Sequence, residues 1–378
     1  MKILQVSDSY LPFPGGVAEH MYNLKKALEK RGHDVWVLTT QYYGDGTIRE
    51  DKDEYRDERV IRMGKVVVLP PLKMFNATQL TVTFDPLLHL HVRDFIRRNR
   101  FDVVHLHGPL APNLPGIVSH YSPYPQVATF HTAFVGFNWN KIGKFLFYRD
   151  SRKIRKYIFV SRVAKDVIDH VYKSTGIIIP NGIDFERFHK QKEKLIKDRT
   201  DKILVGFLSR LEPRKGLDIL IKALAISDFL RNNVELIVGG DGPLRKKYEF
   251  MARDSGIKFK FLGQIERGKV PVFYKSLDVF VAPSRGGESF GMILLEAMAS
   301  GVPVIASDIP GYMEVIKDGF NGILFKNESP ECLSRKLIFL IKDNAMRNSL
   351  VNNALSFARK YDWEIIAERI EEVYLEVT

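Results

Sequence analysis

The sequence predicts an α/β protein built from two doubly wound parallel sheets. Two observations carry this prediction. Short β-branched and aliphatic runs alternate with longer segments of helical period, and this alternation restarts after a charged stretch near the middle of the chain. A length of 378 residues, 45% of them hydrophobic, is enough for two domains that each bury a core.

The first half is expected to alternate strands with helices. Its clearest helix covers residues 17–31, where Met21, Leu24 and Leu28 share one face and Gly32 terminates the helix. Because that face is apolar, we expect it to pack on the sheet. Strands are expected at the aliphatic runs 3–6, 35–38, 66–69, 103–106, 127–130 and 158–160.

The second half begins after a polar, charged stretch at 181–201, which is the expected linker. We set the boundaries of the two domains at 1–185 and 186–362. The chain closes with helices over 330–376, and the segment 363–378 is expected to be a helix that packs back on the N-terminal domain. Strands in this half are expected at 203–208, 234–238, 259–262, 279–282 and 302–306.

Charge and cysteine content limit the function without selecting it. Lys and Arg number 57 against 45 Asp and Glu, and the formal charge of +12 attracts nucleic acid, anionic lipid or nucleotide diphosphates alike. The single Cys332 excludes an intramolecular disulfide and a cysteine-built metal site, which favours a reducing, cytoplasmic setting. No run approaches about 18 apolar residues, so we expect no membrane-spanning helix.

Unusual residues gather where the expected strands end, the edge at which open parallel sheets bind ligands. Tyr10 and the pair Gly15-Gly16 follow the first strand, and His107 and His131 follow two later strands. Backbone amides at Gly15-Gly16 can approach an anion at a helix start, although a tight turn without a ligand fits the same pattern. The alternative for the whole set is that loops are polar in any protein.

Arg210 and Lys215 lie in a loop after the first strand of the second half, and two such cations suit a diphosphate; a solvated basic loop is the alternative. The strongest signal is a glycine-rich loop with Glu288 that leads into an apolar helix with Glu296, expected to begin near Phe290. A buried carboxylate needs a hydrogen-bonding partner. Two ribose hydroxyls would serve Glu296, and a structural cap or buried ion pair is the alternative.

The histidines allow several interpretations. His131 ends an apolar strand, where an imidazole can donate to a sugar hydroxyl or shuttle a proton, and a structural role is the alternative. His105 and His107 face the same side of a strand, but no carboxylate or cysteine set completes a metal site nearby, so we expect no metal. The segment 239–242 lacks the full dinucleotide fingerprint, which disfavours a nicotinamide enzyme.

Together these motifs resemble those of the retaining GT-B glycosyltransferases of family 4, whose Glu-x7-Glu signature falls on Glu288 and Glu296. The resemblance covers essentially the whole chain, and the N-terminal half is most similar to the bacterial phosphatidylinositol mannosyltransferases. It implies two facing Rossmann-like domains with a cleft between them. Further segments that match the family are 14–17, 129–132, 180–184, 240–243, 261–263 and 301–304.

The resemblance implies a nucleotide-sugar donor on the second domain and an acceptor on the first. Arg210 and Lys215 would hold the diphosphate, and Glu288 and His131 would act with them in catalysis. Glu296 would bind the ribose hydroxyls. Further donor contacts would come from Gly15, Gly16, Gly263, Ile265, Glu266, Phe290, Gly291 and Met292, and acceptor contacts from Tyr10, His107, His131 and Thr132. Glu266 near the base would favour a GDP-sugar, and Arg267 in its place a UDP-sugar.

The expected function is retaining transfer of a hexose from GDP-mannose or a UDP-sugar to a lipid-linked, polyol or sugar acceptor, without metal or cofactor. The alternatives are a nucleotide-sugar epimerase of the same fold and a non-enzymatic polyanion-binding protein. No nucleic-acid-binding signature occurs. Basic residues with interleaved aromatics at 93–100 and 141–156 fit a peripheral position on the anionic inner face of the cell membrane, and solvated helix faces are the alternative.

Overall fold

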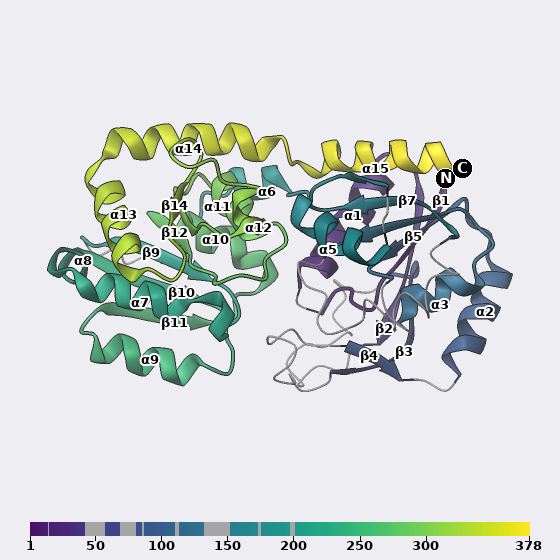
Figure 1. The fold of residues 1–378 in the computed structure, drawn as a ribbon, viewed down its shortest axis with the longest axis horizontal. Helices are drawn as coiled ribbons and strands as arrows, with labels where there is room; N and C mark the ends of the chain where they lie inside the picture. Colours follow the sequence, from purple (N-terminus) through teal and green to yellow (C-terminus); the bar gives the residue numbers. More distant parts are fainter. Residues whose placement is uncertain are drawn as a thin grey trace. The chain divides into compact units, whose positions relative to one another are not determined.

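The structure, a computed structural model, describes residues 1–13, 15–41, 57–68, 81–84, 87–109, 113–131, 152–172, 175–196 and 201–378. These residues form two compact units (Figure 1). Unit 1 comprises residues 1–182 and 363–378, and unit 2 comprises residues 183–362. Each unit has its own sheet and its own apolar core.

In its described residues, unit 1 contains an eight-stranded sheet in the order β4-β3-β2-β1-β5-β6-β7-β8. Neighbouring strands are parallel, except that β4 runs antiparallel to β3 at one edge. The strands are β1 (Lys2–Val6), β2 (Asp34–Gln41), β3 (Val60–Val68), β4 (Thr81–Phe84), β5 (Val103–His107), β6 (Gln126–Phe130), β7 (Ile154–Phe159) and β8 (Gly176–Ile178). The helices are α1 (Gly16–Lys30), α2 (Leu88–Arg98), α3 (Leu114–Tyr121), α5 (Arg162–Tyr172) and α15 (Trp363–Val377).

Successive residues of β1 point to opposite faces of the sheet and enter different cores. Ile3 packs in a cluster with Leu24 of α1 and Ile366 of α15. Leu4 packs in the cluster on the other face, together with residues of α2, α3 and α5. A strand that is buried on both faces needs apolar residues at nearly every position, which is why these strands appear in the sequence as aliphatic runs.

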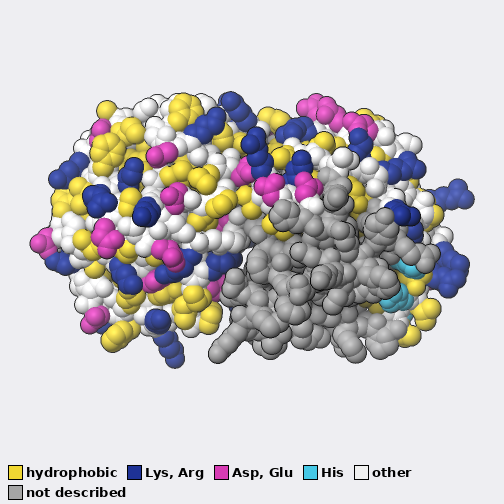
Figure 2. Space-filling model, viewed as in Figure 1, with side chains coloured by type: hydrophobic (Ala, Val, Ile, Leu, Met, Phe, Trp, Pro, Cys, Tyr) yellow, Lys and Arg dark blue, Asp and Glu magenta, His cyan; other side chains and the backbone are white. Residues whose placement is uncertain are grey.

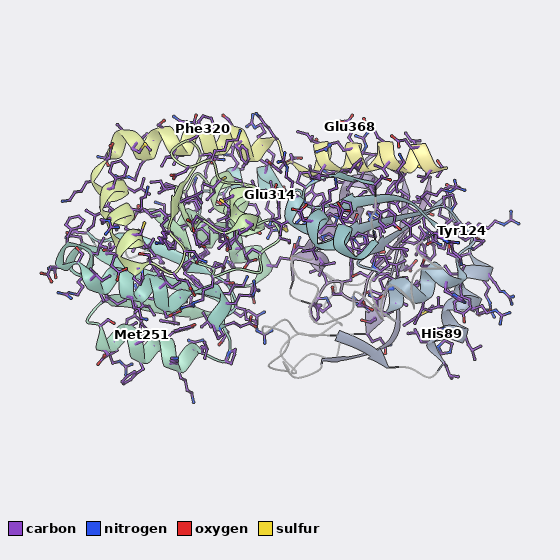
Figure 3. The ribbon with its side chains drawn as sticks, in the orientation of Figure 1. His89, Tyr124, Met251, Glu314, Phe320 and Glu368 are labelled. Atoms are coloured by element: carbon purple, nitrogen blue, oxygen red, sulfur yellow. The ribbon has the colours of Figure 1, made fainter. Side chains whose placement is uncertain are left out.

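The C-terminal helix α15 lies beside α1, as the yellow ribbon of Figure 1 shows. Trp363 and Ile366 are buried on its inner side, while Glu368 is exposed on its outer side (Figure 3). Arg31, which follows α1, pairs with Glu371 of α15 at 2.5 Å. The helix therefore packs within unit 1, although it follows unit 2 in the chain.

Unit 2 contains a six-stranded, all-parallel sheet in the order β11-β10-β9-β12-β13-β14. Its strands are β9 (Ile203–Leu208), β10 (Val234–Gly239), β11 (Lys258–Gly263), β12 (Val279–Ala282), β13 (Val304–Ser307) and β14 (Ile323–Phe325). One face packs against α6 (Phe185–His189), α10 (Val270–Lys275), α11 (Met292–Ala299), α12 (Pro310–Met313) and α14 (Asn344–Arg359). The other face packs against α7 (Leu217–Ile226), α8 (Asp228–Asn233), α9 (Arg245–Asp254) and α13 (Pro330–Lys342).

The predicted fold class, two doubly wound parallel sheets, is confirmed. The strand expected at 203–208 has those bounds as β9, and the helix expected at 17–31 is α1. The strands β4, β8 and β14 were not expected from the sequence. Each has only three or four residues, so its aliphatic run is too short to predict a strand from the sequence.

None of the helices in the part of the chain that the structure describes is long and apolar enough to cross a membrane. Over unit 2, Figure 2 shows basic and acidic side chains interspersed on the face drawn. This mixture differs from the single-sign patch or stripe that marks a nucleic-acid-binding surface.

Candidate functional site

Glu288 lies in the loop that connects β12 to α11, beyond the carboxyl end of β12. Gly291 closes this loop with a φ of 93°, in the left-handed region that favours glycine. A Cβ at this position would lie 2.8 Å from Cδ1 of Tyr312, so a side chain does not fit there. The helix expected to begin near Phe290 is α11, and it begins two residues later, at Met292, because the left-handed Gly291 precedes it.

Three donors converge on one carboxylate oxygen of Glu288, Oε1. Lys215 Nζ lies 2.6 Å from this oxygen, Arg214 Nη1 lies 2.8 Å from it, and Ser284 Oγ lies 3.2 Å from it. The side chains of Glu288, Lys215 and Arg214 are only 17%, 15% and 26% exposed, so solvent screens their charges weakly. We call Arg214, Lys215 and Glu288 the charged cluster.

Electrostatics in the charged cluster keep Glu288 ionised. Burial by itself raises the pKa of Glu288, but the adjacent charges of Lys215 and Arg214 outweigh it and hold the pKa below its usual value. Two cations and one anion meet here, so the cluster carries a net positive charge. A net positive charge of this kind attracts an anionic group.

The backbone brings the two cations to Glu288. A 3-10 turn, Pro213–Lys215, follows β9 and ends at Gly216, which has a φ of 70°. A Cβ on Gly216 would lie 1.9 Å from the carbonyl oxygen of Pro283, so the loop after β9 can approach the loop after β12 only with glycine at this position. The amide of Arg285 donates to the carbonyl of Arg214 at 2.8 Å and ties the two loops together.

Arg210 is not part of this cluster in the structure. Its Nε lies 2.9 Å from Oε1 of Glu212, and its side chain is 48% exposed. Among the described residues, the cation that joins Lys215 at Glu288 is Arg214, which the sequence-based prediction did not select. The signal was present, because Arg214 directly precedes Lys215, but spacing alone does not say which arginine turns back to the glycine-rich loop.

Glu296 lies in the middle of α11 and is half-buried. The hydroxyl of Tyr274, on α10, donates to its Oε2 at 2.9 Å. Burial, and then the charge of Glu296, raise the pKa of Tyr274 well above its usual value, so Tyr274 remains a donor. A carboxylate in an apolar helix needs a hydrogen-bonding partner, and Tyr274 supplies at least one for Glu296.

The residues expected near a nucleotide base gather at the end of β11. Gly263 ends that strand and is buried, Ile265 is half-buried, and Glu266 is exposed. A Cβ on Gly239, at the end of β10, would lie 3.1 Å from Cγ1 of Ile265, so these strand ends pack closely. The amide of Gly240 donates to the carbonyl of Gly263 at 2.7 Å.

In unit 1 the structure brings His107 and His131 together. His107 ends β5, His131 directly follows the neighbouring β6, and their Nδ1 and Nε2 atoms lie 3.1 Å apart. His20, on α1, joins them: its ring centroid lies 4.6 Å from that of His131 and 5.4 Å from that of His107. We call these three residues the histidine cluster. The sequence-based prediction missed His20, and its position one turn into the helix that Gly15-Gly16 opens was the available signal.

The histidine cluster is electrically neutral near pH 7. Burial lowers the pKa of His20 to about 4, although its hydrogen bond to Asn181 opposes the shift. Burial, followed by the neighbouring imidazoles, lowers the pKa values of His107 and His131 well below the usual value. Neutral imidazoles can each donate at one ring nitrogen and accept at the other.

The remaining predicted residues of unit 1 occupy different surroundings. The ring of Tyr10 is buried in an apolar cluster with Leu11, Ala18 and Met21, and this burial raises the pKa of its hydroxyl. Gly16 is the first residue of α1, and Gly15 precedes it with an extended backbone. Thr132 lies outside the described residues.

Part of the basic set expected at a membrane surface is engaged in ion pairs within unit 1. Arg98 pairs with Asp94 at 2.9 Å, and Lys156 pairs with Glu376 at 2.5 Å. The segment 141–151 lies outside the described residues. A membrane surface therefore stays a prediction from the sequence.

Comparisons with known proteins match both halves of the chain to glycosyltransferase families. The family model described as Glycosyltransferase Family 4 matches residues 14–187, and the one described as Glycosyl transferases group 1 matches residues 188–357. The phosphatidyl-myo-inositol mannosyltransferase of Mycobacterium leprae is 30% identical over 99% of this chain and 96% of its own. An uncharacterized glycosyltransferase of Methanocaldococcus jannaschii is 29% identical over 100% and 99%.

Solved structures share the fold. The Anabaena protein Alr3699/HepE in complex with UDP and glucose aligns with a TM-score of 0.77 and 22% identity, over 100% of both chains. The sucrose-phosphate synthase of Thermosynechococcus elongatus aligns with a TM-score of 0.74 and 19% identity, over 99% of this chain and 98% of its own.

The paired parallel sheets and the two family models define the class of protein: an enzyme that transfers a sugar. Neither an epimerase nor a non-enzymatic polyanion-binding protein is favoured by these matches. The chain belongs to the glycosyltransferases of family 4, which confirms the resemblance seen in the sequence.

Proposed function

We propose that the protein transfers a hexose, with retention of configuration, from a nucleotide-diphosphate sugar held by unit 2 to an acceptor held by unit 1. GDP-mannose is the preferred donor in this proposal. The full-length relatives named phosphatidyl-myo-inositol mannosyltransferase support it, and so does the exposed carboxylate of Glu266 beside Ile265, which can accept from the N–H groups of guanine. A UDP-sugar is the alternative donor.

The observation that carries the proposal is the charged cluster. Cleavage of the sugar–phosphate bond develops negative charge on the leaving diphosphate, and cations already in place stabilise that charge most in the transition state. Lys215 is held within 2.6 Å of Glu288, so its ammonium needs little reorganisation during the reaction. Arg210, exposed at the same loop, would leave Glu212 to add a second cation at the diphosphate.

Glu288 has two tasks in this proposal. Its charge orients Lys215 and Arg214, and its carboxylate accepts a hydrogen bond from a hydroxyl of the donor sugar. Phe290 and Gly291 directly precede α11 and Met292 is its first residue, so the unpaired amides at this helix start would favour an anion next to the loop of Glu288. Glu296, oriented by Tyr274, would receive the ribose hydroxyls.

The acceptor would bind near the histidine cluster. Neutral His131 can donate a hydrogen bond to an acceptor hydroxyl or accept one from it. Its Nε2 lies 3.1 Å from Nδ1 of His107, and this contact holds the ring in place. A myo-inositol head group is the first acceptor to test, because that polyol stands in the names of full-length relatives. In the reaction the diphosphate, released on the same side, would take the proton of the attacking hydroxyl, so no protein nucleophile is required.

A thermal-shift panel with GDP, UDP, ADP and NAD tests the donor side. A ligand at 100 times its Kd stabilises a protein by about 2.7 kcal/mol, which corresponds to about 5–10 °C for a unit of this size. We expect GDP to give the largest shift and Glu296→Gln to reduce it. The largest shift with UDP would replace the donor, and a shift with NAD alone would contradict the proposal.

A further inference from the structure

Arg285 lies shortly before Glu288 in the loop after β12, and its guanidinium contacts the segment that follows β9. Its Nη1 donates to the carbonyl oxygen of Pro213 at 2.6 Å. Its Nη1 and Nη2 also donate to Oδ1 and Oδ2 of Asp218, at 2.9 Å and 2.6 Å. These two hydrogen bonds form a bidentate pair, the geometry in which an arginine holds a carboxylate in a fixed direction.

The acceptors of Arg285 lie on both sides of the two cations of the charged cluster in the sequence. Pro213 begins the 3-10 turn Pro213–Lys215, and Asp218 lies in the first turn of α7. Between them, the carbonyl of Arg214 accepts from the backbone amide of Arg285 at 2.8 Å. Arg285 therefore holds this segment at three points, and the segment carries both cations toward the carboxylate of the cluster.

Arg285 is itself held by a third loop, which follows β14. Its Nε donates to Oε1 of Glu328 at 3.0 Å, and its carbonyl accepts from Nδ2 of Asn327 at 2.9 Å. Among the residues that the structure describes, Glu328 is the one residue other than glycine with a positive φ, 58°. That conformation is unfavourable for a residue with a Cβ and persists where the surrounding contacts hold it. The loops after β9, β12 and β14 thus meet at one guanidinium.

The guanidinium of Arg285 is committed to acceptors within unit 2. Each of its three nitrogens donates to one, and the side chain is only 30% exposed. Burial by itself raises the pKa of Asp218, but the hydrogen bonds and charge of Arg285 outweigh it and hold that pKa below its usual value. The pair is therefore ionised near pH 7, and Arg285 is built into the loops rather than presented to a ligand.

We propose that Arg285 is a positioning residue of the donor site: paired with Asp218, it fixes the turn that carries Arg214 and Lys215, and so sets where these two cations lie. It acts through the cations, without touching the donor. A lysine cannot replace it, because an ammonium lacks the planar fork that reaches Pro213 and both oxygens of Asp218. The role in sugar transfer rests on the proposed function, whereas the effect on the charged cluster does not.

NMR of the glutamate carboxyls tests the positioning without any sugar transfer. The full chain would be prepared with ¹³C-labelled glutamate, and the signal of Glu288 would be assigned by its loss in Glu288→Gln. In Arg285→Met the pKa of Glu288 should rise, because the two cations that lower it lose their fixed place. Arg347→Met is the matched control. This arginine of α14 also donates to a backbone carbonyl, that of Leu340 at 2.7 Å, and its loss should leave the pKa of Glu288 unchanged.

Two further variants separate positioning from charge. Arg285→Lys keeps the positive charge without the fork, and the pKa of Glu288 should still rise. Asp218→Ala removes a negative charge, which by itself would lower the pKa of Glu288, whereas release of the turn raises it. We expect a rise. A pKa of Glu288 that is unchanged in Arg285→Met and Arg285→Lys, or that falls in Asp218→Ala, would overturn the proposal.

Transfer kinetics test whether Arg285 acts through Lys215. Arg285→Met should lower kcat about 10–10²-fold and leave the acceptor KM within about twofold. In a chain that already carries Lys215→Ala, the same change should cost at most about threefold, because residues that act as a unit are not additive. A loss of full size in that background would overturn the proposal. A wild-type chain without transfer activity would contradict the proposed function alone, since the NMR titration does not depend on it.

Discussion

Replacement of Lys215 by alanine separates the two tasks assigned to the charged cluster. In the resting protein Lys215 neutralises Glu288 from 2.6 Å, and during reaction it would stabilise the leaving diphosphate. The substitution removes one of three donors to Oε1 and leaves Arg214 and Ser284 in place. Unit 2 should therefore remain folded while the site loses its most buried cation.

The structure allows the size of both effects to be estimated. A hydrogen bond to a charged group contributes about 1.5–3 kcal/mol, and Lys215 is 15% exposed, so little of this is lost to solvent screening. A loss of about 2 kcal/mol lowers the Tm of a unit of this size by about 4–8 °C. Removal of one preorganised donor to transition-state charge lowers kcat by about 10²–10³.

Steady-state transfer kinetics and thermal melts measure these effects. The acceptor KM should stay within about twofold, because Lys215 interacts with charge that develops in the transition state. Lys222→Ala, an exposed lysine on α7, is the matched control and should change neither Tm nor kcat. A folded Lys215→Ala variant with kcat within about threefold of wild type would refute the role assigned to this cation.

Three further predictions follow from the same contacts. Because the folded pKa of Glu288 lies below its unfolded value, its charge contributes stability that is complete above the unfolded pKa and is lost as the pH falls through the folded pKa. Melts across the acid range should show that loss at a higher pH in Lys215→Ala than in wild type. Tyr274→Phe should raise the donor KM about fivefold with little change in kcat, since Glu296 loses one hydrogen bond. An unchanged donor KM would speak against Glu296 as a donor ligand. Gly291→Ala, at a φ of 93°, should destabilise unit 2 by at least about 1–2 kcal/mol in denaturant titrations.

Much of the fold follows from local patterns. Strands buried on both faces, such as β1 and β9, need aliphatic residues at successive positions, and so their ends can be predicted within a residue or two. The sheet edges are different. The strands β8 and β14 have only three residues each, and their pairing depends on neighbours that are distant in sequence.

Some residues of the candidate site could likewise be predicted from the sequence, and others could not. Glu288 and Lys215 could be selected because each follows a strand, and the ends of parallel strands meet at one edge. Arg214 could not be preferred over Arg210 without the turn after β9 that directs it to Glu288. His20 could not be grouped with two strand-end histidines, because the packing of α1 on the sheet, not sequence spacing, brings it there.

Proton NMR of the transfer product tests the central claim most directly. GDP-mannose, whose mannose is α-linked to the diphosphate, would be incubated with the protein and phosphatidyl-myo-inositol in mixed vesicles. The proposed function predicts release of GDP together with an α-mannosyl product, formed at a rate that falls in Lys215→Ala. A β-mannosyl product would contradict retention, and a product formed equally fast without Lys215 would contradict the assigned site.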